Sequence, residues 1–97
     1  MEIKFEILQR TGFVSWNGSE SGVIYRKVRE YDGAKPGNVT RHLKDNRGSA
    51  NDYLIDVIVD GGRIQSHSAA EWLNCEWDNR WNKIRSGKIK LEDRQYQ

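Results

Sequence analysis

The chain has 97 residues, of which 36% are hydrophobic and 31% charged, and a net charge of +2. This length and composition predict a single domain, residues 1–97, with one core and no room for a deep enclosed pocket. No run approaches the roughly 18 consecutive apolar residues of a membrane-spanning helix, the N-terminus lacks the apolar stretch of a signal peptide, and a lone cysteine forms no internal disulfide. We therefore expect a cytoplasmic protein without a membrane partner.

The first third of the sequence predicts antiparallel strands. Residues 2–9 alternate between apolar and polar side chains, which is typical of a strand with one buried face. A second short run at 13–16 leads into a predicted turn at 17–22, where an Asn-Gly pair is a strong hairpin signal. Residues 23–31 form a third predicted strand.

Residues 32–52 are polar and rich in turn-forming residues. A structureless segment of about twenty residues is unusual inside a compact domain. The stretch is therefore either a mobile loop or a short helix from Val39 to Arg47, capped by Asn38. In the second case Val39 and Leu43 are the apolar anchors that hold the helix on the core.

The segment 53–59 predicts an inner strand, because it carries apolar residues on both faces. Asp60, Gly61 and Gly62 form the next turn. Ile64 and Gln65 then belong to a predicted edge strand that leads into a helix.

The segment 68–86 predicts one amphipathic helix. Ser68 and Glu71 fit a capping box at its start, and Gly87 supplies a left-handed stop at its end. The helical periodicity places six residues on the core-facing stripe: Ala69, Ala70, Leu73, Trp77, Trp81 and Ile84.

These elements predict the α+β class: a small antiparallel sheet, or an SH3-like partial barrel, of four to five strands with one C-terminal amphipathic helix. The segments 14–16, 22–28 and 57–61 together resemble Tudor and SH3-type small barrels, in which an aromatic hairpin is followed by a strand ending in Asp-Gly. That resemblance implies the partial barrel and no particular binding residues.

Metal binding and catalysis find little support among the residue types. His42 and His67 lack partners at metal-ligand spacing, and we interpret them as a loop residue and a helix-entry residue. Cys75 lies two turns inside the predicted helix, away from the N-terminus that would activate a thiolate. Asp56 and Asp60 would lie about 13 Å apart along an ideal strand, further than the carboxylate pairs of glycosidases. We therefore predict a non-enzymatic protein with no cofactor, no metal and no small-molecule substrate.

The strongest functional signal is a basic segment, residues 26–47, which contains seven basic and three acidic residues. The basic residues are Arg26, Lys27, Arg29, Lys35, Arg41, Lys44 and Arg47. Strand alternation places Lys27 and Arg29 on one face, and cations interleaved with aromatic residues are typical of surfaces that hold phosphates and stack bases. We expect a small binding module that contacts nucleic acid, or a nucleic-acid-handling protein, through residues 26–47. A merely solvated polar edge and contact with an acidic protein surface are the alternatives.

A second hypothesis comes from Trp72, which lies off the core stripe together with Cys75 and Asn79. An exposed tryptophan is typical of an interface hot spot. These three residues predict a protein interface, as in a small inhibitor or adaptor of a phage or mobile element. The alternative is that a loop, or the C-terminal segment with its alternating residues 88–91, covers Trp72. Residues 88–91 are otherwise a candidate edge strand.

Overall fold

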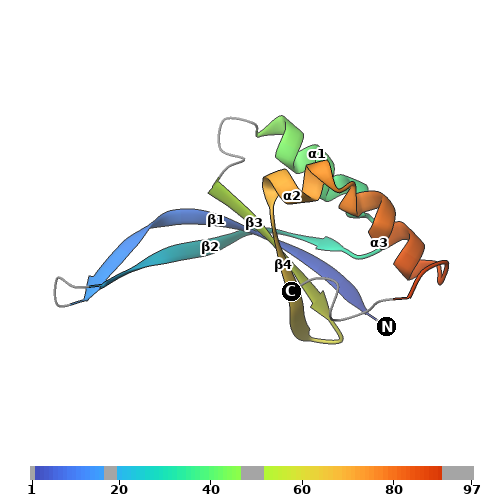
Figure 1. The fold of residues 1–97 in the computed structure, drawn as a ribbon, viewed down its shortest axis with the longest axis horizontal. Coiled ribbons are helices and arrows are strands. Elements are labelled where there is room, and N and C mark those ends of the chain that lie inside the picture. The colour runs from blue at the N-terminus through green and yellow to red at the C-terminus, as the bar shows by residue number, and fades with distance from the viewer. Residues whose placement is uncertain (1, 17–19, 47–51, 91–97) are drawn as a thin grey trace.

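The computed structural model describes residues 2–16, 20–46 and 52–90. In chain order the elements are β1 (Ile3–Trp16), β2 (Glu20–Asp32), α1 (Pro36–Asp45), β3 (Tyr53–Val59), β4 (Gly62–Ser68), α2 (Ala69–Asn74) and α3 (Trp77–Arg85). The strands form one antiparallel sheet in the order β2-β1-β3-β4, and the helices lie on one face of it (Figure 1). The predicted α+β class is confirmed. The sheet is open, and the described residues form three helices, where the sequence predicted one C-terminal helix and left a second short helix before β3 as an alternative.

β1 and β2 form a hairpin that extends beyond the rest of the sheet. The segments predicted as separate strands at 2–9 and 13–16 are one continuous strand. β1 pairs with β3 only as far as Gln9, whereas it pairs with β2 along its whole length. The far part of the hairpin is therefore a two-stranded arm that projects away from the helices (Figure 1). The turn is shorter than predicted because β2 begins at Glu20, and residues 17–19 lie outside the described residues.

A register shift in β2 changes which side chains share a face. Ile7 pairs with Arg29 and Leu8 pairs with Lys27, so that Val28 is an extra residue in a β-bulge. Because the pleat alternates, Arg29 lies with Ile7 on the helix-covered side and Lys27 lies with Leu8 on the open side. The prediction that Lys27 and Arg29 share a face is therefore wrong.

β3 has the predicted bounds, and it is an inner strand as predicted. Its buried apolar side chains on the helix side are Tyr53, Ile55 and Val57. The following turn has only two residues, since Val59 already pairs with Gly62. Asp60 and Gly61 take positive φ values of 50° and 86°, as a tight hairpin turn requires. β4 is an edge strand that leads directly into α2, also as predicted.

The segment 32–52 contains a helix docked on the body, the second of the two alternatives. α1 begins at Pro36, whose missing N–H suits the first helical turn, and not after Asn38 as predicted. It buries the side chains of Pro36, Val39 and Leu43. Before α1 the chain passes close to β1: the Gly33 N–H donates to the Ile3 carbonyl at 2.7 Å, and a Cβ atom at Gly33 would collide with that residue.

The predicted helix at 68–86 is in fact two helices. α2 ends at Asn74 and α3 begins at Trp77. Glu76 between them is left-handed, with a φ of 50°, which interrupts the helical hydrogen bonds. Neither glycine nor proline occurs at this break, so that the local sequence gives no signal for it.

Both predicted ends of this helical region are confirmed. The backbone N–H of Glu71 donates to the Ser68 hydroxyl at 3.1 Å, which caps α2. Gly87 has a φ of 82°. The N–H groups of Gly87 and Lys88 donate to the carbonyls of Ile84 and Lys83 at 3.1 and 2.9 Å, a Schellman motif that ends α3.

The break allows three tryptophans to enter one core. In an unbroken helix, at about 100° per residue, Trp72 and Trp81 would point in opposite directions. In the structure both are 0% exposed and both lie edge-on to Phe5, with ring centroids 5.4 and 5.8 Å away. Trp77 is also buried, whereas Ala70, predicted to lie in the core, is exposed. The prediction that Trp72 offers an exposed apolar face is therefore wrong.

Residues 88–90 form no strand, and Leu91 lies outside the described residues. Within the described ranges, each helix is too short or too polar to cross a membrane.

Candidate functional site

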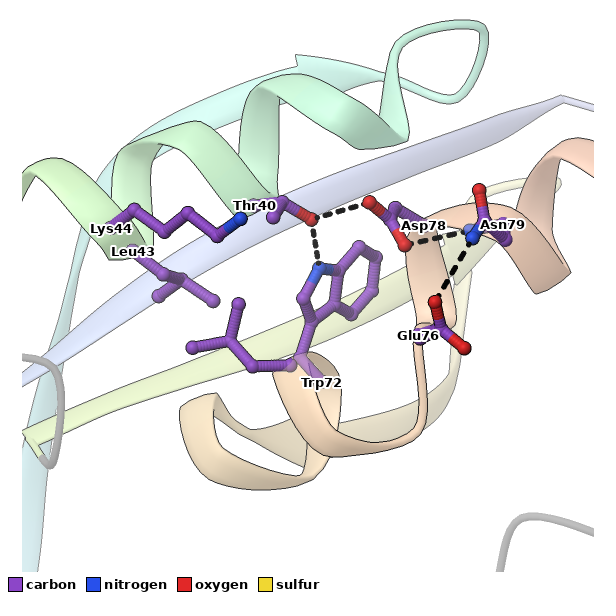
Figure 2. A pocket seen from close by; sticks show the side chains of 8 residues that line it. Thr40, Leu43, Lys44, Trp72, Glu76, Asp78 and Asn79 are labelled. Carbon is purple, nitrogen blue, oxygen red and sulfur yellow. Dashed lines mark hydrogen bonds between the residues drawn. The ribbon is translucent and has the colours of Figure 1, made fainter.

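A hollow of about 450 Å³, here called the helix hollow, lies where α1, α2 and α3 meet. Its floor is apolar: Leu73 of α2 is partly exposed there, and Leu43 of α1 and Trp72 of α2, both 0% exposed, lie beneath. Lys44 and Glu76, both exposed, stand on opposite sides of its rim (Figure 2). The hollow thus has an apolar floor and a polar rim with Lys44 and Glu76 on opposite sides, and the half-buried Asp78 carboxylate also lines it.

A chain of hydrogen bonds fixes one wall of the helix hollow. The indole N–H of Trp72 donates to the Thr40 hydroxyl at 2.9 Å, and that hydroxyl donates to the Asp78 carboxylate at 3.0 Å (Figure 2). The other Asp78 oxygen accepts the backbone N–H of Asn79 at 2.8 Å. Because these residues come from all three helices, the hydrogen bonds hold α1, α2 and α3 in register around the hollow.

The break between α2 and α3 places Glu76 on the rim. A left-handed conformation costs a residue with a side chain about 1–2 kcal/mol, and the burial of Trp72 and Trp77 on either side of the break offsets this cost. The Glu76 carboxylate lies 3.5 Å from the side-chain amide of Asn79, which donates to it. The rim charge is therefore a direct consequence of how the tryptophans pack.

A second depression of about 270 Å³, here called the basic hollow, lies on the opposite side of α1, against β2. Arg29 and Tyr31 of β2 line it together with Asn38, Arg41 and His42 of α1. Asp45 and Asn46 complete its lining. It therefore combines two guanidinium groups with amide donors and a single lining carboxylate.

The His42 ring links the two sides of the basic hollow. Its Nδ1 lies 3.2 Å from the Tyr31 hydroxyl, and the Arg29 guanidinium lies 5.4 Å from the centre of the Tyr31 ring. Burial lowers the pKa of His42, as does the charge of Arg29, against an opposing effect of Asp45. His42 was interpreted as a loop residue but lies half-buried on α1.

The seven basic residues predicted as one surface are distributed over several. Of the six that the structure describes, Arg29 and Arg41 are the two that meet in one hollow, and Arg26 follows Arg29 on the same side of β2. Lys27 lies on the open face, 3.6 Å from each of the carboxylates of Glu6 and Glu30.

The remaining members of that set lie elsewhere. Lys35 occupies the N-cap of α1, and Lys44 stands on the rim of the helix hollow. Arg47 lies outside the described residues. The described residues therefore do not form a single continuous basic surface over 26–47.

Of the three residues predicted as a protein interface, two line the helix hollow and one does not. Trp72 and Asn79 both line the helix hollow, the first as a buried floor and the second on the exposed rim. Cys75 is exposed at the end of α2 and is not part of the lining. Sequence reasoning missed Thr40 and Asp78, because their role depends on α1 docking beside the break between α2 and α3.

His67, interpreted as a helix-entry residue, is 2% exposed in the core. Its ring stacks on Trp77 with centroids 4.3 Å apart, and its two nitrogens lie 2.5 Å from a Glu71 oxygen and 2.7 Å from a Gln65 oxygen. Burial lowers its pKa, against the opposing hydrogen bond and charge of Glu71 and the charge of Asp56. Both ring nitrogens are thus engaged inside the fold.

Among residues 2–16, 20–46 and 52–90 there is no cluster of three or more His, Cys, Asp or Glu side chains with the arrangement of a metal site. Comparisons of the chain with protein-family models, curated protein sequences and solved structures found no match. The two hollows are therefore the features from which function is inferred.

Proposed function

We propose that the chain is a non-enzymatic binding module that takes an apolar side chain of a partner protein into the helix hollow. The observation that carries this proposal is the hollow itself, with about 450 Å³ above a floor of Leu43, Trp72 and Leu73. The volume lies in the range of typical ligand-binding pockets, and among the described residues the lining combines three apolar residues with five polar or charged ones. At protein interfaces such pockets receive the side chains that dominate affinity.

The shape of the helix hollow supports tight binding, because it exists before the partner arrives. The hydrogen bonds from Trp72 through Thr40 to Asp78 tie the three helices together, so that little ordering remains to be done on association. Full burial of one leucine-sized side chain between the floor and the partner contributes at most about 1.5–3 kcal/mol.

The rim adds a preference for charge. Lys44 and Glu76 stand on opposite sides of the mouth (Figure 2). A partner segment that places an acidic residue near Lys44 and a basic residue near Glu76 gains attraction at both ends, whereas the reverse order brings like charges together. Such pairs steer and orient association more than they add affinity.

A displayed random-peptide library tests this proposal without a known partner. The library is selected on the wild-type protein, and binding of the enriched peptides is compared with Leu73→Glu, which puts a carboxylate on the floor. Asn82→Glu, an exposed α3 position that does not line the hollow, is the matched control. We expect peptides with one apolar residue between opposite charges, and a loss of about tenfold or more for Leu73→Glu alone, equivalent to ~1.4 kcal/mol.

Two results would overturn the proposal. One is enrichment of peptides without an apolar residue, and the other is equal binding to Leu73→Glu and to the wild type when both are folded by circular dichroism. The charge-swapped double variant Lys44→Glu with Glu76→Lys keeps the net charge, and it should reverse the charge order of the selected peptides.

A further inference from the structure

We propose that the basic hollow is a separate site that binds a phosphate group of a nucleic-acid strand. It shares no lining residue with the helix hollow. Its occupancy therefore does not depend on the function proposed above, and either proposal can fail alone.

The basic hollow contains two guanidinium groups, those of Arg29 and Arg41. Arg29 and Arg41 both line the basic hollow and both are exposed, and neither forms an ion pair with a described residue. Both carry a positive charge and line the same hollow, Arg29 from β2 and Arg41 from α1. A phosphate between them accepts charge-assisted hydrogen bonds, to which the planar guanidinium is suited.

The rest of the lining fits the same ligand. The side-chain amide of Asn38 lines the hollow and supplies a further donor type. Among the described lining residues Asp45 is the one carboxylate, so that their net charge is positive. The contact between the Tyr31 hydroxyl and His42 Nδ1, at 3.2 Å, holds the β2 side and the α1 side together around the space.

A third cation indicates a polymer of phosphates and not a single one. Arg26 pairs with Gln9 of β1, and Arg29 pairs with Ile7. Because Ile7 and Gln9 are two residues apart on β1, the two arginines lie on the same side of the sheet. The two arginines are therefore about 7 Å apart along the strand, and Arg26 is the nearer of the two to the arm, because β1 pairs with β3 only as far as Gln9. A row of cations along a strand matches a chain of phosphates better than it matches one phosphorylated side chain.

The bulge at Val28 separates this row from the rest of the basic segment. Lys27, between the two arginines in sequence, lies on the open face near Glu6 and Glu30. The chain thus contains a matched internal control in two exposed cations on the opposite side of the sheet, namely Lys27 of β2 and Lys4 of β1.

Fluorescence anisotropy with short labelled oligonucleotides, single-stranded and duplex, tests the site over a salt titration that starts at about 50 mM. The double variant Arg29→Ala with Arg41→Ala is compared with Lys4→Ala with Lys27→Ala, which removes the same charge. We expect the arginine variant to lose about tenfold or more in affinity and to reduce the slope of log K against log salt by about 1.5–2. The lysine variant should change affinity by less than about threefold.

Competition identifies the source of the phosphate. Inorganic phosphate and a phosphoserine peptide, each at the same phosphate concentration as unlabelled oligonucleotide, should displace the label far less well than the oligonucleotide does. The nucleic-acid assignment is overturned if the peptide competes equally, if the lysine variant loses as much affinity as the arginine variant, or if the wild type binds no oligonucleotide at low salt.

Discussion

α1 separates two hollows that are built in different ways. Thr40 and Lys44 face α2 and α3, whereas Asn38 and Arg41 face β2. The helix hollow is tied by hydrogen bonds to a fully buried tryptophan, and the basic hollow is lined largely by exposed polar side chains along an edge strand. Substitutions in the helix hollow are therefore expected to change stability and binding together. In the basic hollow, charge can be removed while the fold is kept.

The largest expected effect is on stability when the buried tryptophan is removed. Trp72→Ala should lower the free energy of unfolding by about 3–5 kcal/mol, because it leaves a large cavity beneath the helix hollow. Arg41→Ala, on the other side of α1, should change it by less than about 0.5 kcal/mol. Urea denaturation followed by circular dichroism measures both values, and similar values for the two variants would contradict the distinction between the hollows.

The next effect concerns the hydrogen bonds of the wall. Thr40→Val keeps the shape but removes the hydroxyl, which leaves the Trp72 N–H and one Asp78 oxygen without their partner. We expect a loss of about 1–3 kcal/mol in unfolding free energy. Thr40→Ser retains the hydroxyl and should recover most of that loss. A Thr40→Val variant as stable as the wild type would show that these hydrogen bonds do not stabilise the fold.

The pH dependence of stability can be compared between the core, which contains His67, and the basic hollow, which is lined by His42. His67 and His42 both have a pKa below the ordinary value of 6.5, chiefly through burial. As the pH falls through about 6.5, each histidine is therefore protonated in the unfolded chain before it is protonated in the folded chain. The free energy of unfolding is thus highest above that pH and decreases as the pH is lowered. The limiting slope is about 1.4 kcal/mol per pH unit for each histidine.

Replacement of each histidine by glutamine tests this account in thermal unfolding between about pH 5 and 7.5. His67→Gln should flatten the pH dependence of the melting temperature more than His42→Gln, since His67 is the more deeply buried of the two. An unchanged slope in His67→Gln would show that its proton uptake does not differ between the folded and unfolded chain.

The smallest effect concerns the helix break. Glu76→Gly removes the cost of a side chain at a φ of 50° but adds backbone entropy to the unfolded state. The expected gain is therefore only a few tenths of a kcal/mol to about 1 kcal/mol. Gly87→Ala, at a φ of 82°, is the reverse change and should cost about 1 kcal/mol. Destabilisation by Glu76→Gly would mean that the carboxylate itself holds the break.

Local signals in the sequence were sufficient for the features that depend on a few adjacent residues. The inner strand at 53–59, the Ser68 cap and the Gly87 stop all follow from side-chain alternation and capping chemistry. The break at Glu76 could not be predicted in this way, because its cause is the shared burial of Trp72 and Trp81 in one core. A tertiary requirement overrides helix propensity there.

The sites were less predictable than the fold, for a similar reason. Arg29 and Arg41 were identified as cations, but the bulge at Val28 that separates Arg29 from Lys27 leaves no mark in a pattern of alternation. The wall of the helix hollow depends on Thr40, whose neighbours become known only when α1 is docked. Contacts between elements that are distant in sequence define both hollows, and alternation within one element does not reveal them.

The most direct test of the helix hollow is an amide NMR titration of isotope-labelled protein with a peptide selected on the wild type. The account predicts shifts at Leu73, at Asn79 and at the Trp72 indole N–H, with no change at Arg29 or Arg41. Shifts confined to the basic hollow, or to the sheet's open face, would contradict it.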